Sequence, residues 1–274
     1  MDYKRILTIQ DISCVGQCSM TVALPVLSAS GLETCVLPTA LLSTHTGGFG
    51  KPAVVHFGGE LEHFYRHWAE NDILFDAILV GYLGSVAAVK AAGEILDRML
   101  APGGIGIVDP AMADHGKLYS GFDTAYVEAM KDLCAKADIL LPNITEAAML
   151  SGQLYQEALE EGYVNQLLDG LGQRCVILTG VGYRPGQTGV VVQQESQRWH
   201  YTHSKTDRNF HGTGDLFAAC LTGALMRGKQ LQDAARIAAD FTCRTIEHTM
   251  ENPAHWYGIK FEPLLPEWMN MLNR

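Results

Sequence analysis

The amino-acid sequence predicts an α/β fold with a mostly parallel central sheet. Six short apolar runs have the length and composition of buried strands, and most are separated by segments with helical periodicity, several of which end at glycine. Strands that alternate with helices in this way are typical of a parallel sheet covered on both faces. The expected strands are residues 5–9, 34–37, 77–80, 105–108, 139–141 and 175–179, and the expected helices between them are residues 20–29, 86–100, 124–135 and 156–171.

The last third of the chain departs from strict alternation. Residues 187–193 and 198–203 are predicted to form two antiparallel strands at the edge of the sheet. Further helices are expected at residues 215–228 and 232–248. There is no internal repeat and no Pro/Ser-rich linker. With 274 residues, 47% of them hydrophobic, the chain can bury one large core, so we expect a single domain over residues 1–274.

Composition and charge argue against several classes of protein. No apolar run is long enough to span a bilayer, and the first apolar run is too short for a signal peptide, so we expect a soluble cytoplasmic protein with no membrane partner. The 7 cysteines are scattered, which indicates reduced thiols rather than a zinc site. The net charge of −10, with no basic run, argues against nucleic-acid binding. Any bound phosphate must be held by backbone amides, a few cations and a metal.

The segment from Phe210 to Ala219 is a glycine-bearing turn that runs into an apolar helix. Gly212 and Gly214 let an anion approach the backbone, and the first amides of the following helix can bind phosphate oxygens. Asp215 falls in the first helical turn, where the helix dipole stabilises an ionised carboxylate. The turn therefore places an anion receiver beside a base. The alternative is an ordinary helix start that Asp215 only caps.

In a doubly wound sheet, ligands bind beyond the carboxyl ends of the strands, so the residues that follow each strand are candidates for the site. Asp11 follows the first strand. Residues 41–52 follow the second and are polar and glycine-rich, which predicts a mobile loop over a small ligand. His45 and Thr46, each taken alone, are better explained as turn residues. The loop is not a P-loop, because the first glycine is missing and Pro52 replaces the Ser or Thr that would hold magnesium.

Oxygen-bearing side chains follow three further strands. Tyr82, after the third strand, is either part of the core or a ring stacked on a ligand. Asp109 and Asp114 follow the fourth strand. Asn143 follows the fifth, with Glu146 one helical turn further on. Such oxygen ligands suit a magnesium ion that keeps several waters and shares substrate phosphates. For Asn143 and Glu146 alone, the alternative is a helix cap with its reciprocal acid.

Two more segments lie near the predicted strand ends. Thr179 and the glycines that follow it lack the last glycine of a dinucleotide-binding fingerprint. Lys205 lies between the edge strands and the glycine-bearing turn, close enough in sequence to reach the same phosphates, although a solvated lysine is the plainer interpretation. Neither a Ser-His-Asp order nor a nucleophile elbow is present in the sequence.

Six segments, taken together and in this order, resemble the ribokinase superfamily, and within it the branch of pyridoxal kinases and hydroxymethylpyrimidine kinases. They are Ile9-Gln10 and residues 43–47, 81–85, 109–112, 142–146 and 212–215. The His-Thr-Gly and Gly-Tyr segments point to the pyridoxal kinase group. The resemblance implies a ribokinase-like three-layer α/β/α sandwich, a homodimer, and phosphorylation of the 5′-hydroxymethyl group of a vitamin B6 vitamer by ATP and Mg²⁺ in pyridoxal 5′-phosphate salvage. It leaves open a monovalent cation such as K⁺.

By this resemblance, Asp215 is the base that accepts a proton from the hydroxymethyl group of the substrate. The other expected roles are an anion hole at Gly212, Thr213 and Gly214; substrate contacts at Asp11, Thr46 and Tyr82; nucleotide contacts at Asp109, Tyr119, Asn143, Thr179 and Lys205; and a magnesium site at Asp114, Asn143 and Glu146. Phosphoryl transfer needs positioning and charge stabilisation more than covalent chemistry, so groups of these kinds suffice.

Two positions depart from the family pattern. Asp11 stands where pyridoxal kinases commonly have Ser, and a carboxylate there can pair with a protonated ring nitrogen or an amine, which favours pyridoxamine or an aminopyrimidine. Ala113 stands where glycine is usual, which leaves the reach of Asp114 open. The alternative functions are a hydroxymethylpyrimidine (phosphate) kinase of thiamine synthesis, a sugar kinase and a non-catalytic vitamer-binding protein. Sugar kinases of the superfamily usually carry a lid of strands near the N-terminus, and this sequence has too few strands there to form one. The intact Asp215 argues against a non-catalytic protein.

Overall fold

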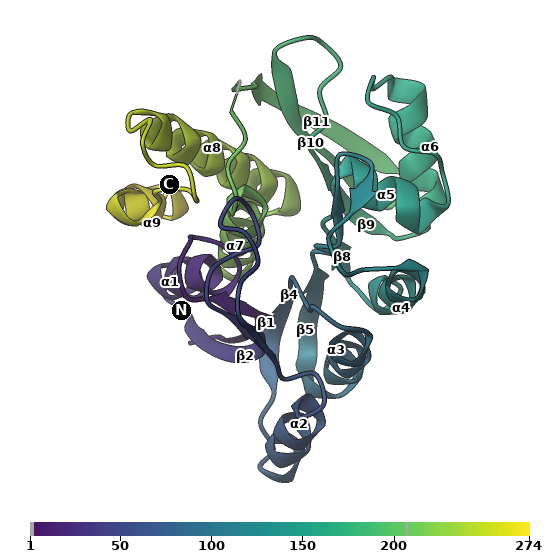
Figure 1. Ribbon diagram of the computed structural model, residues 1–274, viewed down its shortest axis with the longest axis vertical. Coiled ribbons are helices and arrows are strands. Elements are labelled where there is room, and N and C mark those ends of the chain that lie inside the picture. The colour runs from purple at the N-terminus through teal and green to yellow at the C-terminus, as the bar shows by residue number, and fades with distance from the viewer. Residues whose placement is uncertain (1–2, 207) are drawn as a thin grey trace.

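A nine-stranded sheet runs through the protein (Figure 1). The structure, a computed structural model, describes residues 3–206 and 208–274. Within them the strand order is β11-β10-β9-β8-β5-β4-β1-β2-β3. These strands are β1 (Arg5–Ser13), β2 (Glu33–Leu42), β3 (Val54–His56), β4 (Phe75–Val80), β5 (Leu100–Val108), β8 (Ile139–Leu140), β9 (Cys175–Thr179), β10 (Gln187–Gln194) and β11 (Gln197–Ser204). A separate small hairpin pairs β6 (Ala113–Asp114) with β7 (Lys117–Leu118).

The sheet is mostly parallel, as predicted. Along the part of the sheet ordered β9-β8-β5-β4-β1-β2, every neighbouring pair of strands is parallel. The strands β3, β10 and β11 pair antiparallel at the two edges. The predicted antiparallel edge strands are therefore confirmed, and β3 is an additional one at the opposite edge.

Helices cover both faces of this sheet, which makes three layers (Figure 1). On one face lie α1 (Met20–Ala29), α7 (Thr213–Met226), α8 (Leu231–Met250) and α9 (Leu265–Leu272), the last preceded by the short 3-10 helix η1 (Glu262–Leu264). On the other face lie α2 (Leu61–Glu70), α3 (Val86–Met99), α4 (Thr124–Cys134), α5 (Ile144–Ser151) and α6 (Glu161–Leu171). The predicted three-layer α/β/α sandwich is thus confirmed.

The central strands are apolar throughout because both of their faces are buried. In β1, Ile6 packs into the core under α1 and α7, while the next residue, Leu7, packs into the core on the opposite face. In β4, Ala77 and Ile78 divide between the two cores in the same way. Such strands show no polar alternation in the sequence, which is why short apolar runs located them.

One predicted helix begins later than expected. Helical periodicity extended from residue 156, but α6 begins at Glu161. The Tyr163 hydroxyl accepts a hydrogen bond from Gln156 N (3.2 Å) and donates one to Leu154 O (2.9 Å), so this segment folds back on the helix instead of continuing it. The helix α2 was not predicted, because only Leu61 and Tyr65 of its residues are buried and its apolar signal is weak.

None of the helices in the described parts of the chain combines the length and the apolar character that a bilayer crossing requires.

Candidate active site

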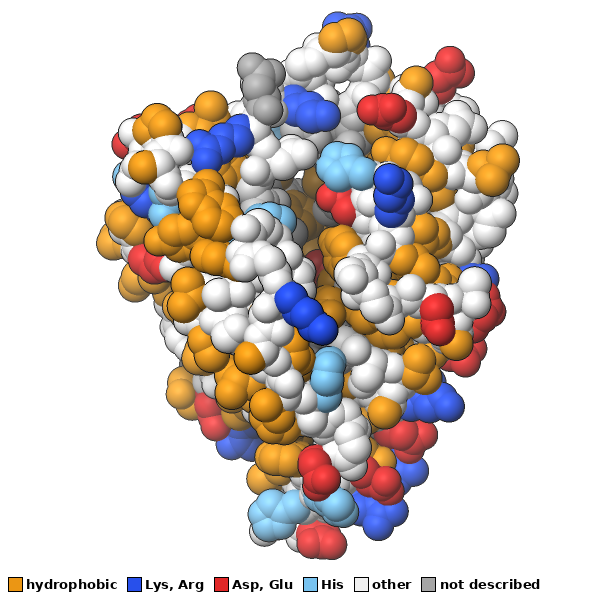
Figure 2. Space-filling model, viewed as in Figure 1, with side chains coloured by type: hydrophobic (Ala, Val, Ile, Leu, Met, Phe, Trp, Pro, Cys, Tyr) orange, Lys and Arg blue, Asp and Glu red, His pale blue; other side chains and the backbone are white. Residues whose placement is uncertain are grey.

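The carboxyl ends of the parallel strands meet at one edge of the sheet. Backbone hydrogen bonds between strand ends keep the following loops in register, for example from Gly81 N to Ile9 O (3.0 Å) and from Asp109 N to Val80 O (2.9 Å). The molecular surface is hollowed between the two halves of the molecule, and acidic side chains are visible within the hollow (Figure 2). Most of the residues predicted to form the site lie on the loops of this edge.

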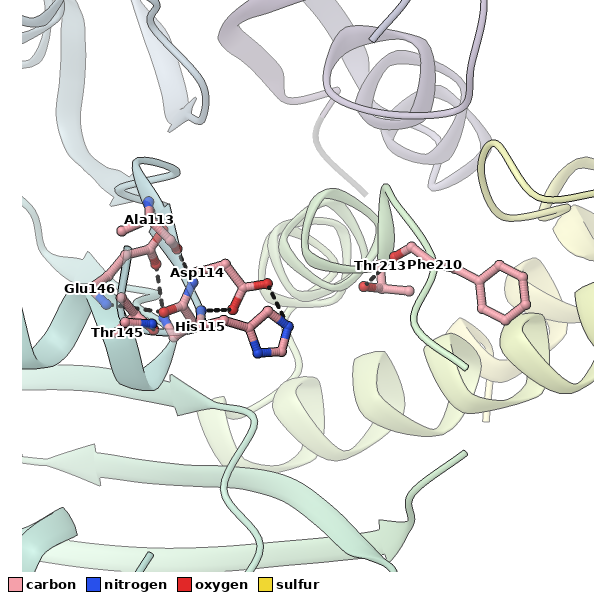
Figure 3. A network of polar contacts seen from close by, with 9 residues as sticks. Ala113, Asp114, His115, Thr145, Glu146, Phe210 and Thr213 are labelled. Carbon is pink, nitrogen blue, oxygen red and sulfur yellow. Dashed lines mark hydrogen bonds and ion pairs between the residues drawn. The ribbon is translucent and has the colours of Figure 1, made fainter. Parts of the chain in front are cut away.

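The anion turn, residues 210–214, depends on one glycine. Gly212 has φ +85°, and a Cβ at this position would lie 2.0 Å from the carbonyl oxygen of Gln17. Both the backbone conformation and the close approach therefore require glycine. The first hydrogen bond of α7 runs from Leu216 N to Gly212 O (2.9 Å), so the amides between these residues head the helix, where anions bind. Thr213 Oγ1 donates to Phe210 O (3.2 Å) and tightens the turn (Figure 3).

Asp215 lies in the first turn of α7, as predicted. Burial raises the pKa of its carboxyl to about 6, a hydrogen bond from the Ser19 backbone lowers it, and the charge of Asp11 raises it. A carboxyl with this pKa is mostly ionised at neutral pH and is well matched to accepting a proton there. The structure therefore places a carboxyl whose pKa suits proton acceptance directly after the anion turn.

Asp11 lies close to Asp215. Its side chain belongs to a residue only 3% exposed, and burial raises its pKa, while hydrogen bonds from Ser19 and Ser13 lower it in part. Ser13 Oγ donates to Asp11 Oδ2 over 3.1 Å. Burial raises the pKa of Tyr82 to about 12, and the charge of Asp11 adds to this rise. Asp11 thus acts electrostatically on both Tyr82 and Asp215, so the fold has brought the three side chains into one region.

Tyr82 is neither a fully buried core residue nor an isolated ring. It is partly exposed, and its ring stacks on Phe122 with the centroids 5.5 Å apart and the planes at 29°. Phe122 stacks in turn on Tyr126 at 3.8 Å. The Tyr82 carbonyl accepts from Thr39 Oγ1 (3.1 Å), which ties this loop to the neighbouring strand β2. One side of the Tyr82 ring is therefore supported by an aromatic stack.

A second carboxyl, that of the half-buried Asp109, faces the anion turn from the end of β5. A Cβ added to Gly214 would lie 3.9 Å from Asp109 Oδ2, so the turn and this carboxylate are neighbours. Burial raises the pKa of Asp109 well above its usual value, and the charges of Glu146 and Asp215 raise it further. The two charged side chains that act on Asp109 are both acidic, so a cation at this place would be strongly favoured.

Asn143 and Glu146 form the helix cap that was the alternative to a metal site. Glu146 Oε2 accepts from Asn143 N (2.9 Å), and Asn143 Oδ1 accepts from Glu146 N (3.0 Å). Glu146 Oε1 also accepts from Met112 N (3.0 Å), and the Asn143 amide donates to Ala113 O (2.8 Å), so the cap fastens the chain that follows β5 (Figure 3). Burial raises the pKa of Glu146 to about 7 although these backbone amides lower it.

The hairpin of β6 and β7 carries Asp114 at its tip. The Asp114 side chain is exposed, and its Oδ1 accepts from His115 N (2.8 Å). Asp114 and His115 project from the hairpin toward the side of the site that carries Thr213 (Figure 3). Tyr119 follows the hairpin; burial raises the pKa of its hydroxyl, and the charges of Glu146 and Asp114 raise it further. Asp114 and Tyr119 therefore belong to the same acidic surroundings.

Three other predicted residues lie at the margin of the site. Thr179, at the end of β9, pairs with Asn143 in an isolated parallel bridge. Lys205 directly follows β11, which runs in the same direction as β9, so its exposed side chain starts from the same edge of the sheet. Thr46 is exposed in the loop after β2.

His45 is not a plain turn residue, contrary to the sequence-based interpretation. It is 5% exposed, and Gly47 N donates to its Nδ1 (3.0 Å). Because Nδ1 accepts, the proton of the neutral ring is on Nε2, which donates to the carbonyl oxygen of Tyr257 (2.7 Å). The partner lies 212 positions away in the chain, so no local sequence signal identifies this contact.

The donor set of the site suits magnesium shared with a ligand rather than a closed metal cage. Within residues 3–206 and 208–274, no group of three or more His, Cys, Asp or Glu side chains could hold a metal ion. The carboxylate beside the anion turn is that of Asp109, and the exposed Asp114 projects from its hairpin toward the side of the site that carries Thr213. Magnesium bound by a few such oxygens keeps several waters and takes phosphate oxygens as further ligands.

The parallel sheet, the glycine turn and the adjacent half-buried carboxyl of Asp215 fit phosphoryl transfer to an alcohol. The chain belongs to the Phosphomethylpyrimidine kinase family, which it matches over residues 65–258.

Individual relatives agree with this assignment. The chain is 31% identical over 262 residues to the pyridoxine/pyridoxal/pyridoxamine kinase of Bordetella avium, covering 89% of this chain and 85% of that protein. The crystal structure of pyridoxal kinase from Lactobacillus plantarum matches with a TM-score of 0.90 and 34% identity, covering 98% of both chains. The hydroxymethylpyrimidine/phosphomethylpyrimidine kinase of Haemophilus influenzae is 27% identical over 193 residues, or 66% of this chain and 68% of that protein. The predicted membership of the pyridoxal kinase group is confirmed.

Gly212→Ala is expected to cost more than about 1 kcal/mol of the free energy of unfolding. The new Cβ both strains a backbone at φ +85° and overlaps the Gln17 carbonyl oxygen. Gly228→Ala is the matched control, because Gly228 has φ +84° with nothing within 4 Å of its Cβ position. Urea unfolding of both variants measures the difference. Equal losses would show that the overlap with Gln17 contributes nothing.

Asp215→Asn is expected to stabilise the protein at pH 8. The folded-state pKa of about 6 lies above the usual value of 3.8, so the native state binds the proton more tightly than the unfolded state and loses stability as the pH rises between these values. The neutral amide escapes this loss, which amounts to about 3 kcal/mol at most. Urea unfolding at pH 8 and pH 4 measures the gain, which should vanish at the lower pH. A gain that does not change with pH would contradict the assignment. Exposed Asp132→Asn serves as the control.

Proposed function

We propose that this protein transfers the γ-phosphoryl group of ATP to the 5′-hydroxymethyl group of a vitamin B6 vitamer, in pyridoxal 5′-phosphate salvage. The observation that carries the proposal is the half-buried Asp215 carboxyl, whose pKa is raised to about 6, immediately after the anion turn. The printed activities of the Bordetella and Lactobacillus relatives support the choice of acceptor. The single sheet through the described residues supports one kinase domain over residues 1–274.

In the proposed reaction, the hydroxymethyl oxygen of the vitamer forms a bond to the γ-phosphorus while the bond from phosphorus to the ADP oxygen breaks. Asp215 accepts the hydroxyl proton, and ADP leaves with the electrons of the broken bond. The amides of Gly212, Thr213 and Gly214 head α7 and stabilise the negative charge on the transferring group. Positioning and charge stabilisation thus supply most of the catalysis.

The nucleotide is proposed to lie on the other side of the anion turn. Magnesium, when bound, supplies the positive charge that neutralises the phosphates of ATP. Asp109 faces Gly214 and would hold this ion or its waters, together with the exposed Asp114. Asn143 and Glu146 hold the intervening segment in place through the capping box, so their part in the magnesium site is one of positioning. The remaining proposed nucleotide contacts are Tyr119, Thr179 and Lys205.

The vitamer ring is proposed to lie among Asp11, Thr46 and Tyr82. Tyr82 is supported on one side by Phe122 and offers its remaining surface to a planar ring. Asp11 is a nearly buried carboxyl that a protonated ring nitrogen or an amine would stabilise in its ionised form. This arrangement favours pyridoxamine among the vitamers.

A hydroxymethylpyrimidine kinase is the second candidate, because the family match and the Haemophilus relative both carry that activity in their names. Its substrate also presents a hydroxymethyl group on a planar nitrogen heterocycle, so the same base and anion turn would serve. A non-catalytic vitamer-binding protein is less well supported, since such a protein has no need of a base with a raised pKa beside an anion turn.

Turnover of purified protein with ATP and magnesium separates these functions. Pyridoxal, pyridoxamine, pyridoxine and hydroxymethylpyrimidine are supplied in separate reactions, and ADP release and the mass of the product are followed. Turnover of a B6 vitamer is expected. Turnover of the pyrimidine alone would overturn the proposal in favour of the second candidate, and binding without turnover would support a non-catalytic protein.

Activity is expected to depend on the ionisation of Asp215. Because the carboxylate must be ionised to accept a proton, kcat/KM for the vitamer should fall as the pH is lowered through about 6. Asp215→Asn keeps the size of the side chain but removes the base, and kcat should fall about 10³-fold. Steady-state kinetics from pH 5 to pH 9 measure both effects. A variant within tenfold of the wild type would refute the role of base.

Asp11→Ser is expected to change vitamer preference. Loss of the carboxylate removes the partner of a cationic group, so kcat/KM for pyridoxamine should fall relative to that for pyridoxine, by about tenfold for a lost charge-assisted hydrogen bond. Asp11→Asn, which keeps the shape and removes the charge, should shift preference in the same direction. Unchanged ratios among the three vitamers in both variants would exclude Asp11 as a determinant of preference.

A further inference from the structure

The loop between α8 and η1 contacts two separate parts of the proposed site. We call residues 252–258 the C-terminal clasp and residues 43–50 the acceptor loop, since the latter carries the proposed substrate contact Thr46. The clasp lies more than 200 positions from the acceptor loop in the sequence, as the separation of 212 between His45 and Tyr257 indicates. No sequence motif assigned to the proposed reaction includes it.

The clasp holds the acceptor loop through one hydrogen bond and an aromatic cluster. His45 Nε2 donates to Tyr257 O (2.7 Å). The Phe49 ring lies 4.7 Å from the Trp256 ring and 5.7 Å from the Tyr257 ring, centroid to centroid. A Cβ on Gly48 would lie 2.5 Å from Trp256, so the loop backbone rests directly on this indole. The acceptor loop is therefore held at its buried end and at its tip.

The clasp also holds the chain that leads into the anion turn. The Arg208 guanidinium donates to the carbonyl oxygens of Pro253 (3.3 Å) and His255 (3.2 Å). It lies over the Phe210 ring, 4.9 Å from the centroid. Because the guanidinium is planar and its two donors are fixed relative to each other, this pair of contacts sets the orientation of the clasp as well as its distance.

The acceptor loop and the anion turn meet directly, which closes the set of contacts. A Cβ on Gly47 would lie 2.2 Å from the His211 ring, and the rings of His45 and His211 have centroids 4.7 Å apart. The clasp is anchored at its end by the bridge from Gly258 to Gln17, the residue whose carbonyl packs against the anion turn. Acceptor loop, anion turn and clasp are thus in mutual contact.

We propose that the C-terminal clasp sets the position of the acceptor loop relative to the anion turn, and that Trp256 is the positioning residue through which it does so. The inference rests on the proposed function. Trp256 is 44% exposed, so its ring contributes little to the core, yet it supports Phe49 and the backbone of Gly48 two residues beyond Thr46. When a loop that binds one substrate is displaced, the binding of that substrate weakens more than the binding of a second substrate held elsewhere.

Trp256→Ala tests this directly. The KM for the vitamer is expected to rise about tenfold, while the KM for ATP stays within about twofold, because the nucleotide contacts lie on other loops. Trp256→Phe keeps an aromatic ring against Phe49 and should restore the vitamer KM to within about twofold of the wild type. Phe64→Ala removes an aromatic ring of similar exposure, 49%, on the distant helix α2 and should change neither constant.

Hydrogen exchange of the free protein provides a readout that does not depend on activity. In Trp256→Ala, amides of the acceptor loop should exchange faster, while those of the central strand β4 should not change. A similar rise in both KM values, or unchanged vitamer KM and unchanged exchange in the acceptor loop, would overturn the proposal. If the wild type turns over no vitamer, the proposed function fails, and the exchange measurement still decides whether the clasp holds the loop.

Discussion

The packing of Gly212 against the Gln17 carbonyl oxygen is the contact on which the rest of the site depends. Only a hydrogen atom fits between these two backbones, and only the left-handed conformation of Gly212 turns the chain into α7 at this point. The contact brings the start of α7 against the turn that precedes α1, where the Ser19 backbone reaches the Asp215 carboxyl. Gln17 also pairs with Gly258. Gln17 thus contacts both the anion turn and the C-terminal loop, and the nearby Ser19 contacts Asp215.

The site brings together several carboxyl groups at buried or half-buried positions. Burial raises the pKa of Asp11, Asp109 and Asp215, and the charge of one carboxylate raises the pKa of another. Burying carboxylates without cationic partners is unfavourable, so such a group is better explained by the ligand than by the scaffold. In the proposed reaction, magnesium bound with the nucleotide would supply positive charge beside these carboxyl groups. These carboxyl groups lower the stability of the free protein, which is consistent with a site that binds a metal nucleotide.

The two activities named among the relatives act on substrates that differ in their ring. A B6 vitamer and a hydroxymethylpyrimidine both present a hydroxymethyl group on a flat nitrogen heterocycle, so the anion turn and Asp215 can serve either. What distinguishes the substrates is the ring, and the ring is proposed to meet Asp11 and Tyr82. The fold is shared with these relatives, and the residues proposed to meet the ring are a few side chains at the strand ends.

The sequence by itself determined the alternation of strands and helices, because run length and helical period are properties of neighbouring residues. It also offered a helix cap by Asn143 and Glu146, three positions apart, as the alternative to a magnesium site, and the structure shows this cap. The assigned roles at the site, including that of Asp215 as base, stay predictions, since they depend on substrates.

Only the tertiary structure decided the remaining features. The late start of α6 follows from the hydroxyl of Tyr163 bonding to Leu154 outside the helix. His45 acquires its buried position and its tautomer from a carbonyl 212 residues away. The pKa of Asp215 is raised because segments distant in the chain bury its carboxyl and bring the charge of Asp11 near it. Contacts of this kind form when distant segments are brought together by the closing of the core, and no local pattern in a single sequence encodes them.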